Sequence, residues 1–188
     1  MKVIDESQLE EDPVYRYQYL AEFIGFGDED VAAIRSVIGQ FAPKIPQIVD
    51  TTYEKMLQYD ATARHFLPRQ HGFEGEPAKS LADLDMNDPQ IKFRKEHLQR
   101  YLMNLMGHSY NDKLAKYLNI TGKIHTPKTG SKLIDVPLVQ MNALMGLLSD
   151  ILYQTIHEFG LEAEKEFQVQ RAFQKLLWIQ NDFINRHY

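Results

Sequence analysis

A chain of 188 residues with 44% hydrophobic and 25% charged residues has the size and composition of one soluble globular domain, and is too apolar for a disordered protein. Its formal net charge of −5, with no Lys/Arg cluster along one face, argues against a nucleic-acid surface. The absence of cysteine excludes disulfides, thiolate metal sites and cysteine nucleophiles, and the acidic N-terminus is no signal peptide. No apolar run is long enough for a membrane span, so we expect a cytoplasmic protein that binds neither nucleic acid nor membrane.

The first half of the chain predicts a series of short amphipathic helices. Helices are expected over residues 13–26, 28–41 and 43–59, with a further short helix over 60–67. Pro13 suits the first turn of a helix, and Gly27 and Asp28 mark a stop followed by a new N-cap. Residues 68–88 have no helical period and carry Gly and Pro, so we expect a loop with at most one turn.

The second half predicts longer helices over residues 87–108, 109–125, 135–160 and 161–187. The segment 135–160 is apolar nearly all round, which is typical of a buried central helix. Pro127 and Gly130 end the helix before it. With weak strand signals throughout, the sequence predicts an all-α fold.

His125 is the main candidate for a metal ligand. It lies on one stripe with Leu114, Leu118 and Thr121, so its ring should point inward. A buried histidine bonded to a carbonyl explains this equally well. However, a lone inward imidazole at a helix end can also be an axial ligand, and haem iron needs only one imidazole. No other His, Cys or carboxylate has the spacing of a zinc or di-iron site.

Tyr53 is the candidate polar residue opposite this histidine. It lies on the inner face of the helix over 43–59, where a phenol can donate a hydrogen bond to bound dioxygen, which carries partial negative charge. An ordinary core tyrosine whose hydroxyl reaches a carbonyl remains the alternative.

His97 could lie at the edge of a cavity. The remaining histidines are expected at the solvated surface: His65, His71, His108, His157 and His187.

The order and spacing of several segments resemble the protoglobins and the globin domains of globin-coupled sensors. "IVDTTY" resembles their B helix with its distal tyrosine, and "SYNDKLAKYLNITGKIH" resembles their F region. There, an aliphatic–Gly pair precedes the proximal histidine; here the pair is Thr121 and Gly122. "DVPLVQMN" and "FQKLLWIQ" resemble the G and H helices, and the helix over 13–26 resembles the extra helix before helix A.

This resemblance implies a globin-like three-over-three helical sandwich that holds haem b. Residues 1–27 would be an N-terminal extension with the pre-A helix, and residues 28–188 the globin domain. The resemblance makes His125 the proximal iron ligand and Tyr53 the distal polar residue, with Leu98 and Leu147 lining the pocket. Thr52 is also expected to contact the cofactor; it stands beside Tyr53, where protoglobins often have an aromatic residue. Pro127 stands where sensor globins often have an arginine.

We therefore expect a pentacoordinate haem protein that reversibly binds dioxygen, carbon monoxide or nitric oxide and is not an enzyme. It would be a single-domain gas binder or a gas-sensor domain; an initiating Met1 and an end close to that of the globin H helix favour the first. We also expect that it can form a homodimer through its C-terminal helices. Two alternatives stay open. One is a haem-free regulatory interaction module. The other is a haem enzyme that detoxifies nitric oxide or an oxidant, with an external electron donor, although the sequence shows no distal His–Arg pair.

Overall fold

The computed structural model describes residues 1–107, 109–127 and 132–188, and every regular element in these ranges is helical. The all-α prediction is confirmed; Gly130 and His108 lie outside the described residues. The elements, in chain order, are α1 (Glu6–Glu11), α2 (Pro13–Ile24), α3 (Asp28–Phe41), η1 (Ala42–Lys44), α4 (Ile45–Leu57), α5 (Asp60–Ala63), η2 (Arg64–Phe66), η3 (Leu81–Asp83), α6 (Pro89–Gly107), α7 (Asp112–Lys123), α8 (Leu138–Glu158) and α9 (Ala163–Asn185).

The start of α2 matches the prediction because its capping residues are in place. The Asp12 side chain accepts a hydrogen bond from the Val14 amide at 2.8 Å, and Pro13 follows as the first helical residue. Gly25 ends α2 in the left-handed region at φ +67°, so the helix stops at Ile24 rather than at residue 26. The short helix α1 was not predicted; it is too short for a detectable apolar period.

The loop after η2 follows the predicted irregular path, with η3 as its single turn among the elements described. The side chain of Gln90, fully buried at the start of α6, holds this loop. Its amide nitrogen donates to the carbonyls of Phe66 and Pro68 at 2.6 and 3.2 Å, and its oxygen accepts from the Gln70 amide at 2.7 Å. The segment around η2 is thereby fixed to α6.

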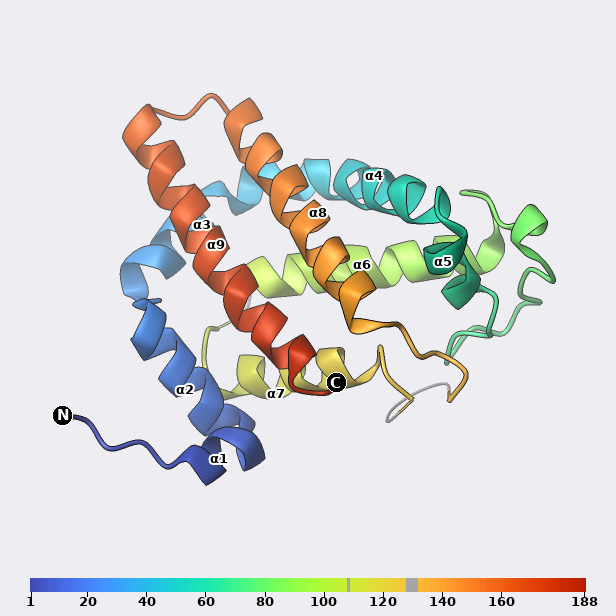
Figure 1. The fold of residues 1–188 in the computed structure, drawn as a ribbon. Helices are drawn as coiled ribbons and strands as arrows, with labels where there is room; N and C mark the ends of the chain where they lie inside the picture. Colours follow the sequence, from blue (N-terminus) through green and yellow to red (C-terminus); the bar gives the residue numbers. More distant parts are fainter. Residues whose placement is uncertain (108, 128–131) are drawn as a thin grey trace.

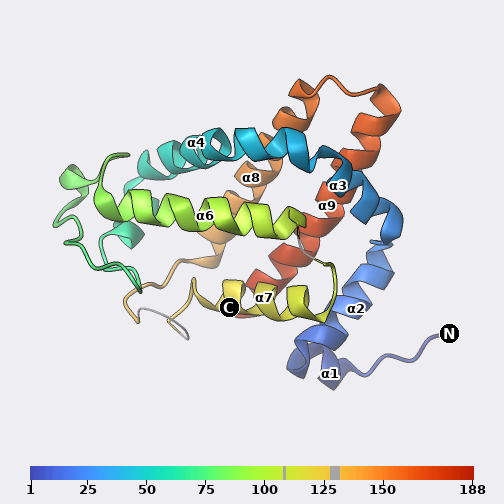
Figure 2. The same cartoon turned by 180° about the vertical axis from the view of Figure 1, so that it is seen from behind.

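The helices form two packed layers. In Figure 1, α8 and α9 lie side by side across the front, and they contact each other along their length. Figure 2, from the opposite side, shows α4 and α6 side by side in front of them, in agreement with their mutual contacts. α3 packs on both α9 and α6, while α7 packs on α9 and α2. Among the described helices, none is both long and apolar enough to cross a membrane.

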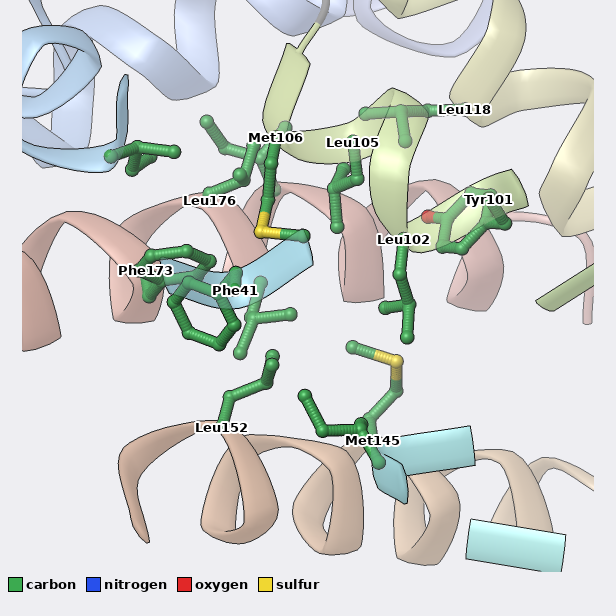
Figure 3. Close-up of a cluster of buried hydrophobic side chains, with 14 of the residues drawn as sticks. Phe41, Tyr101, Leu102, Leu105, Met106, Leu118, Met145, Leu152, Phe173 and Leu176 are labelled. Atoms are coloured by element: carbon green, nitrogen blue, oxygen red, sulfur yellow. The ribbon is translucent and has the colours of Figure 1, made fainter. Parts of the chain in front are cut away.

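The core lies between the layers and draws on helices from both ends of the chain. Figure 3 shows Phe41 of α3, Leu105 of α6 and Phe173 of α9 meeting in one apolar cluster, and each is almost fully buried. α2 is joined to this body by an ion pair, in which Arg16 Nε and Nη2 lie 2.5 and 2.9 Å from the Asp182 carboxylate of α9. The proposed division at residues 27 and 28 stays a prediction.

Candidate functional site

A cavity of about 840 Å³ lies among α4, η2, α6, α7 and α8, which is within the size range of small-molecule sites. Its wall is mostly aliphatic and aromatic, with a small number of polar side chains. Four of the predicted site residues line this cavity: Tyr53, Leu98, His125 and Leu147. The structure therefore brings together residues that are up to 94 positions apart in the sequence (147 − 53).

His125 lies in the turn directly after α7, with its ring at the cavity wall. Its Nδ1 is 3.0 Å from the carbonyl oxygen of Thr121, four residues earlier, which fixes the ring orientation. In this arrangement Nδ1 carries the proton, and Nε2 keeps a free lone pair. Burial lowers the pKa of His125 to about 4, against the opposing effect of the Thr121 hydrogen bond, so the ring is neutral at pH 7.

Tyr53 and Thr52 are neighbours on α4, but their side chains point to different places. Tyr53 is 6% exposed, faces the cavity, and its ring packs against that of Phe66 with centroids 5.6 Å apart. Burial raises the pKa of its hydroxyl, which therefore stays protonated and can donate. Thr52 is fully buried, and its hydroxyl donates to the Ile48 carbonyl at 2.7 Å. Among the described residues that border the cavity, Thr52 is not included.

The middle of α6 supplies one wall of the cavity. Arg94, His97 and Leu98 all border it, since positions three and four apart lie on one face of a helix. The His97 ring meets Phe93 edge to face at a centroid distance of 4.3 Å, and burial lowers its pKa. The Arg94 guanidinium lies over the Phe66 ring, 5.1 Å from its centroid. The opposite wall includes Leu147, from α8.

Three further polar residues that border the cavity have a buried oxygen with no hydrogen-bond partner among the described residues. They are Tyr101 on α6, with its hydroxyl, and Gln140 on α8 and Gln180 on α9, each with its amide oxygen. The Gln180 nitrogen contacts the Met145 sulfur at 3.4 Å, and the Tyr101 ring stacks on Tyr117 with centroids 5.7 Å apart. Burial raises the pKa of Tyr101 well above its ordinary value, so this hydroxyl is also a permanent donor.

The predicted surface positions of the other histidines are partly wrong. His71 and His157 are exposed, as predicted, but His187 is only 8% exposed, beneath the end of α9. His65 borders the cavity, and its buried Nε2 has no hydrogen-bond partner. The sequence did not predict this position because α5 and η2 are too short for an apolar period that would indicate their buried face.

Arg94 was not predicted as a site residue for a different reason. Charged residues are normally assigned to the outside of an amphipathic helix, but Arg94 lies on the face of α6 that borders the cavity. The spacing of Arg94 and His97, one helical turn apart, was the available signal. Both residues border the cavity, as His125 does. Whether they form a distal His–Arg pair depends on the position of a cofactor, so the expectation that the sequence has no such pair stays a prediction.

A family model described as Protoglobin matches residues 14–188, from the second residue of α2 to the end of the chain. The chain belongs to the protoglobin family. Among solved structures, the globin domain of a Geobacter sulfurreducens globin-coupled sensor superposes with a TM-score of 0.72 at 19% sequence identity, and the alignment covers 91% of this chain and 96% of that domain. A search of curated proteins gives no match.

These comparisons confirm the predicted fold: this protoglobin is a globin-type helical sandwich with an additional helix before the first globin helix. In that order α3 and α4 are the first globin helices, α6 and α7 follow, and α8 and α9 close the fold. The predicted site residues lie on α4, α6, α8 and the end of α7. Their roles toward a cofactor stay predictions.

Proposed function

We propose that this protoglobin holds haem b through His125 and reversibly binds dioxygen, carbon monoxide or nitric oxide at a pentacoordinate iron. The observation that carries the proposal is the state of the His125 ring. Its Nδ1 is held by the Thr121 carbonyl, its pKa is lowered to about 4, and its remaining nitrogen borders the cavity. This is what an axial imidazole requires: a neutral ring, a fixed tautomer and a free lone pair.

The residues of the cavity fit a haem in chemistry as well as in size. The wall is apolar enough to cover a porphyrin, and its volume of about 840 Å³ suits a large planar cofactor. Among the described residues, no group of three or more His, Asp or Glu side chains could hold a bare metal ion. A cofactor that brings four of its own nitrogen ligands needs only the single imidazole that this chain offers.

When bound, haem would supply the iron at which a gas molecule binds. His125 holds and orients the cofactor, and Thr121 fixes the His125 ring through its carbonyl. Tyr53, a permanent donor in an apolar wall, offers a hydrogen bond to a gas that gains negative charge. Leu98 and Leu147 exclude water from the pocket. Thr52, whose hydroxyl already bonds to Ile48, supports α4 rather than the ligand.

The test removes the axial imidazole. We expect His125→Ala to bind haemin at least roughly 100-fold more weakly than the unmodified protein, because a metal–ligand bond has no substitute in this wall. Titration of haemin into the apoprotein, followed at the Soret band, measures this. The matched control is His157→Ala, since His157 is exposed on α8. Equal haem affinity in His125→Ala and the control would refute the assignment.

A haem enzyme is a second candidate, which the positions of Arg94 and His97 support. A neutral histidine beside a cationic arginine can move a proton and stabilise negative charge on a peroxide. Hydrogen peroxide would take two electrons and two protons from an external donor and leave as two water molecules. Peroxide consumption by the haem-loaded protein with a reducing dye, lost in His97→Gln while carbon monoxide still binds, would support this candidate. A rate equal to that of free haemin would reject it.

Further features belong to the same proposal. A homodimer would form through the C-terminal helices, a cytoplasmic location follows the sequence prediction, and residues 28–188 would be the globin domain with residues 1–27 as its extension. The chain would act as a single-domain gas binder or as the sensor domain of a larger protein. A haem-free interaction module is the less favoured candidate, because a cavity of about 840 Å³ is at odds with the filled core that such a module needs.

A further inference from the structure

Arg94 is a partly buried cation that forms no ion pair with a carboxylate in the described parts of the chain. Burial lowers its pKa, and the charge of Asp88, which makes no direct contact with it, only partly opposes this effect. Its Nη2 donates only two long hydrogen bonds, each 3.4 Å, to the carbonyls of His65 and Pro68. Its Nε is buried and has no hydrogen-bond partner. A guanidinium has five N–H donors in a planar fork, so most of its capacity is unused.

Arg16 shows how this chain can pair a partly buried guanidinium. Arg16 binds the Asp182 carboxylate with two hydrogen bonds, of 2.5 and 2.9 Å, and this pair raises the pKa of Arg16. Burial instead lowers the pKa of Arg94. Because an unpaired buried charge is strongly unfavourable, Arg94 is the group in the cavity wall that gains most from an incoming anion.

Arg94 borders the cavity beside two aromatic side chains that also line it. The guanidinium lies over Phe66, whose ring in turn packs against Tyr53. Burial raises the pKa of Tyr53, and the charge of Arg94 opposes this effect, so Arg94 lies close enough to Tyr53 to act on it. The side of the cavity near Tyr53 therefore presents two hydrogen-bond donors, and neither of them has an acceptor of good geometry among the described residues.

We propose that Arg94 is the anion-binding residue of this cavity, and that it forms a charge-assisted pair with a negatively charged group of the occupant. The inference builds on the proposed haem site and names a property of what enters it. Two sources share this chemistry. One is a carboxylate of the porphyrin, which carries two; the other is a small inorganic anion that binds as a ligand beside Tyr53. Arginine suits either source because its planar fork can bind two oxygens at once.

The experiment compares Arg94→Met, which keeps the length of the side chain but removes the charge, with Arg94→Lys, which keeps a charge without the fork. Lys92→Met is the control: Lys92 is exposed on the same helix, and its substitution changes the net charge by the same amount as Arg94→Met. The first arm titrates the apoproteins with protoporphyrin IX and with its dimethyl ester, which lacks the carboxylates. The second arm titrates the ferric haem-loaded proteins with azide, an anion, and with imidazole, which is neutral.

Loss of one charge-assisted pair corresponds to a roughly 10- to 100-fold lower affinity. If Arg94 pairs with a carboxylate, Arg94→Met lowers the affinity for protoporphyrin IX by this factor and leaves that for the ester unchanged. If it pairs with an inorganic ligand, the variant lowers the affinity for azide and leaves that for imidazole unchanged. In either case Arg94→Lys keeps part of the affinity, and Lys92→Met behaves as the unmodified protein.

Equal affinities of Arg94→Met and the unmodified protein for all four ligands would overturn the inference, as would an equal loss for charged and neutral ligands, which marks a purely structural role. If Arg94→Met does not fold, Arg94→Gln replaces it, because Arg94→Gln and Arg94→Lys also compare a neutral with a positively charged side chain at this position. Failure of the unmodified protein to bind any porphyrin would instead refute the proposed haem site, so the two failures are distinguishable.

Discussion

Tyr53 shows at the scale of one residue how burial prepares a hydrogen-bond donor. Its hydroxyl keeps its proton because burial raises the pKa, and the wall around it is apolar. We expect Tyr53→Phe to retain haem and to release dioxygen roughly 3- to 10-fold faster, which corresponds to the loss of one hydrogen bond of about 1 kcal/mol. Stopped-flow displacement of dioxygen by carbon monoxide measures the rate. An unchanged rate would remove Tyr53 from the function.

His125 makes the stability of the apoprotein depend on pH. Its pKa is about 4 in the folded protein and 6.5 in a freely solvated histidine, so between these values the unfolded chain takes up a proton that the folded chain does not. Stability therefore falls as the pH is lowered from 6.5 toward 4. We expect urea unfolding at pH 7, 6 and 5 to show this fall, with a smaller slope in His125→Gln. The same slope in both proteins would contradict the assignment.

The same residues show what could be predicted of the site and what could not. His125 and Tyr53 stand on regular inner stripes of helices, and such stripes are visible in one sequence. Arg94 contacts His65 where the side-chain hydrogen bonds of Gln90 hold the segment after α5 against α6. These hydrogen bonds join residues about twenty positions apart, and no periodic pattern in the sequence predicts such a contact.

At the scale of elements, the contact between α7 and α9 depends on Gly122. A Cβ atom at this position would lie 2.1 Å from the carbonyl oxygen of Phe183 and 2.7 Å from Cδ2 of His187. The backbone of α9 cannot yield cheaply, so any larger side chain must push α7 outward. Gly122 thus supplies a physical reason for the Thr–Gly pair that precedes the histidine by three residues.

We expect Gly122→Ala to destabilise the protein by about 3 kcal/mol or more through overpacking, and to weaken haem retention because α7 carries His125 at its end. Chemical denaturation measures the first effect and haemin titration the second. Gly146→Ala is the matched control: an added Cβ on α8 meets nothing within 4 Å, so this variant should gain about 0.5–1 kcal/mol. Equal stabilities of the two variants would show that the close approach of the helices is not required.

The helices themselves were predictable to within a few residues, because caps and apolar stripes coincide. α2, α3 and α7 each begin after an N-cap residue of a favoured type: Asp12, Gly27 and Asn111. α1 has no buried residue, so no apolar pattern could reveal it; it rests on the cap supplied by Asp5. Patterns detect burial, and they miss elements that owe their existence to local hydrogen bonds alone.

At the scale of the whole molecule, α9 carries large apolar side chains on its outer face. Phe167 is 55% exposed and Trp178 is 62% exposed, and Arg171 lies between them with its guanidinium 5.5 Å from the Phe167 ring centroid. Exposed aromatic side chains with an arginine are typical of interface centres. The homodimer through the C-terminal helices stays a prediction, and this face of α9 is the surface on which it can be tested.

We expect Trp178→Glu to shift such a dimer to monomer at micromolar concentration, since a buried unpaired charge on a two-fold axis meets its own copy. Sedimentation velocity measures the state, and the unchanged helical circular dichroism of the variant shows that it folds. Lys92→Glu, on the exposed side of α6, is a control with a larger change of charge. A monomeric unmodified protein would contradict the dimer outright.

The layered arrangement of the molecule was predicted through the family resemblance, whereas helical periods alone established only the class. The order of α4, α6, α7 and α8 around one cavity arises from contacts between residues far apart in the chain, which a single sequence does not display. The resemblance carried this long-range information in the spacing of its motifs.

The size of the cavity has a consequence for the life of the protein in a cell. A void of about 840 Å³ between packed helices forgoes much of the contact energy of a filled core, so the apoprotein opens more often than a solid globin-sized domain would. An occupant that binds only the folded chain adds stability by mass action, and proteases remove the open form. If the cavity holds haem as proposed, the amount of this protein should therefore follow the supply of iron and porphyrin, and starvation for either should shorten its half-life even while its synthesis continues unchanged.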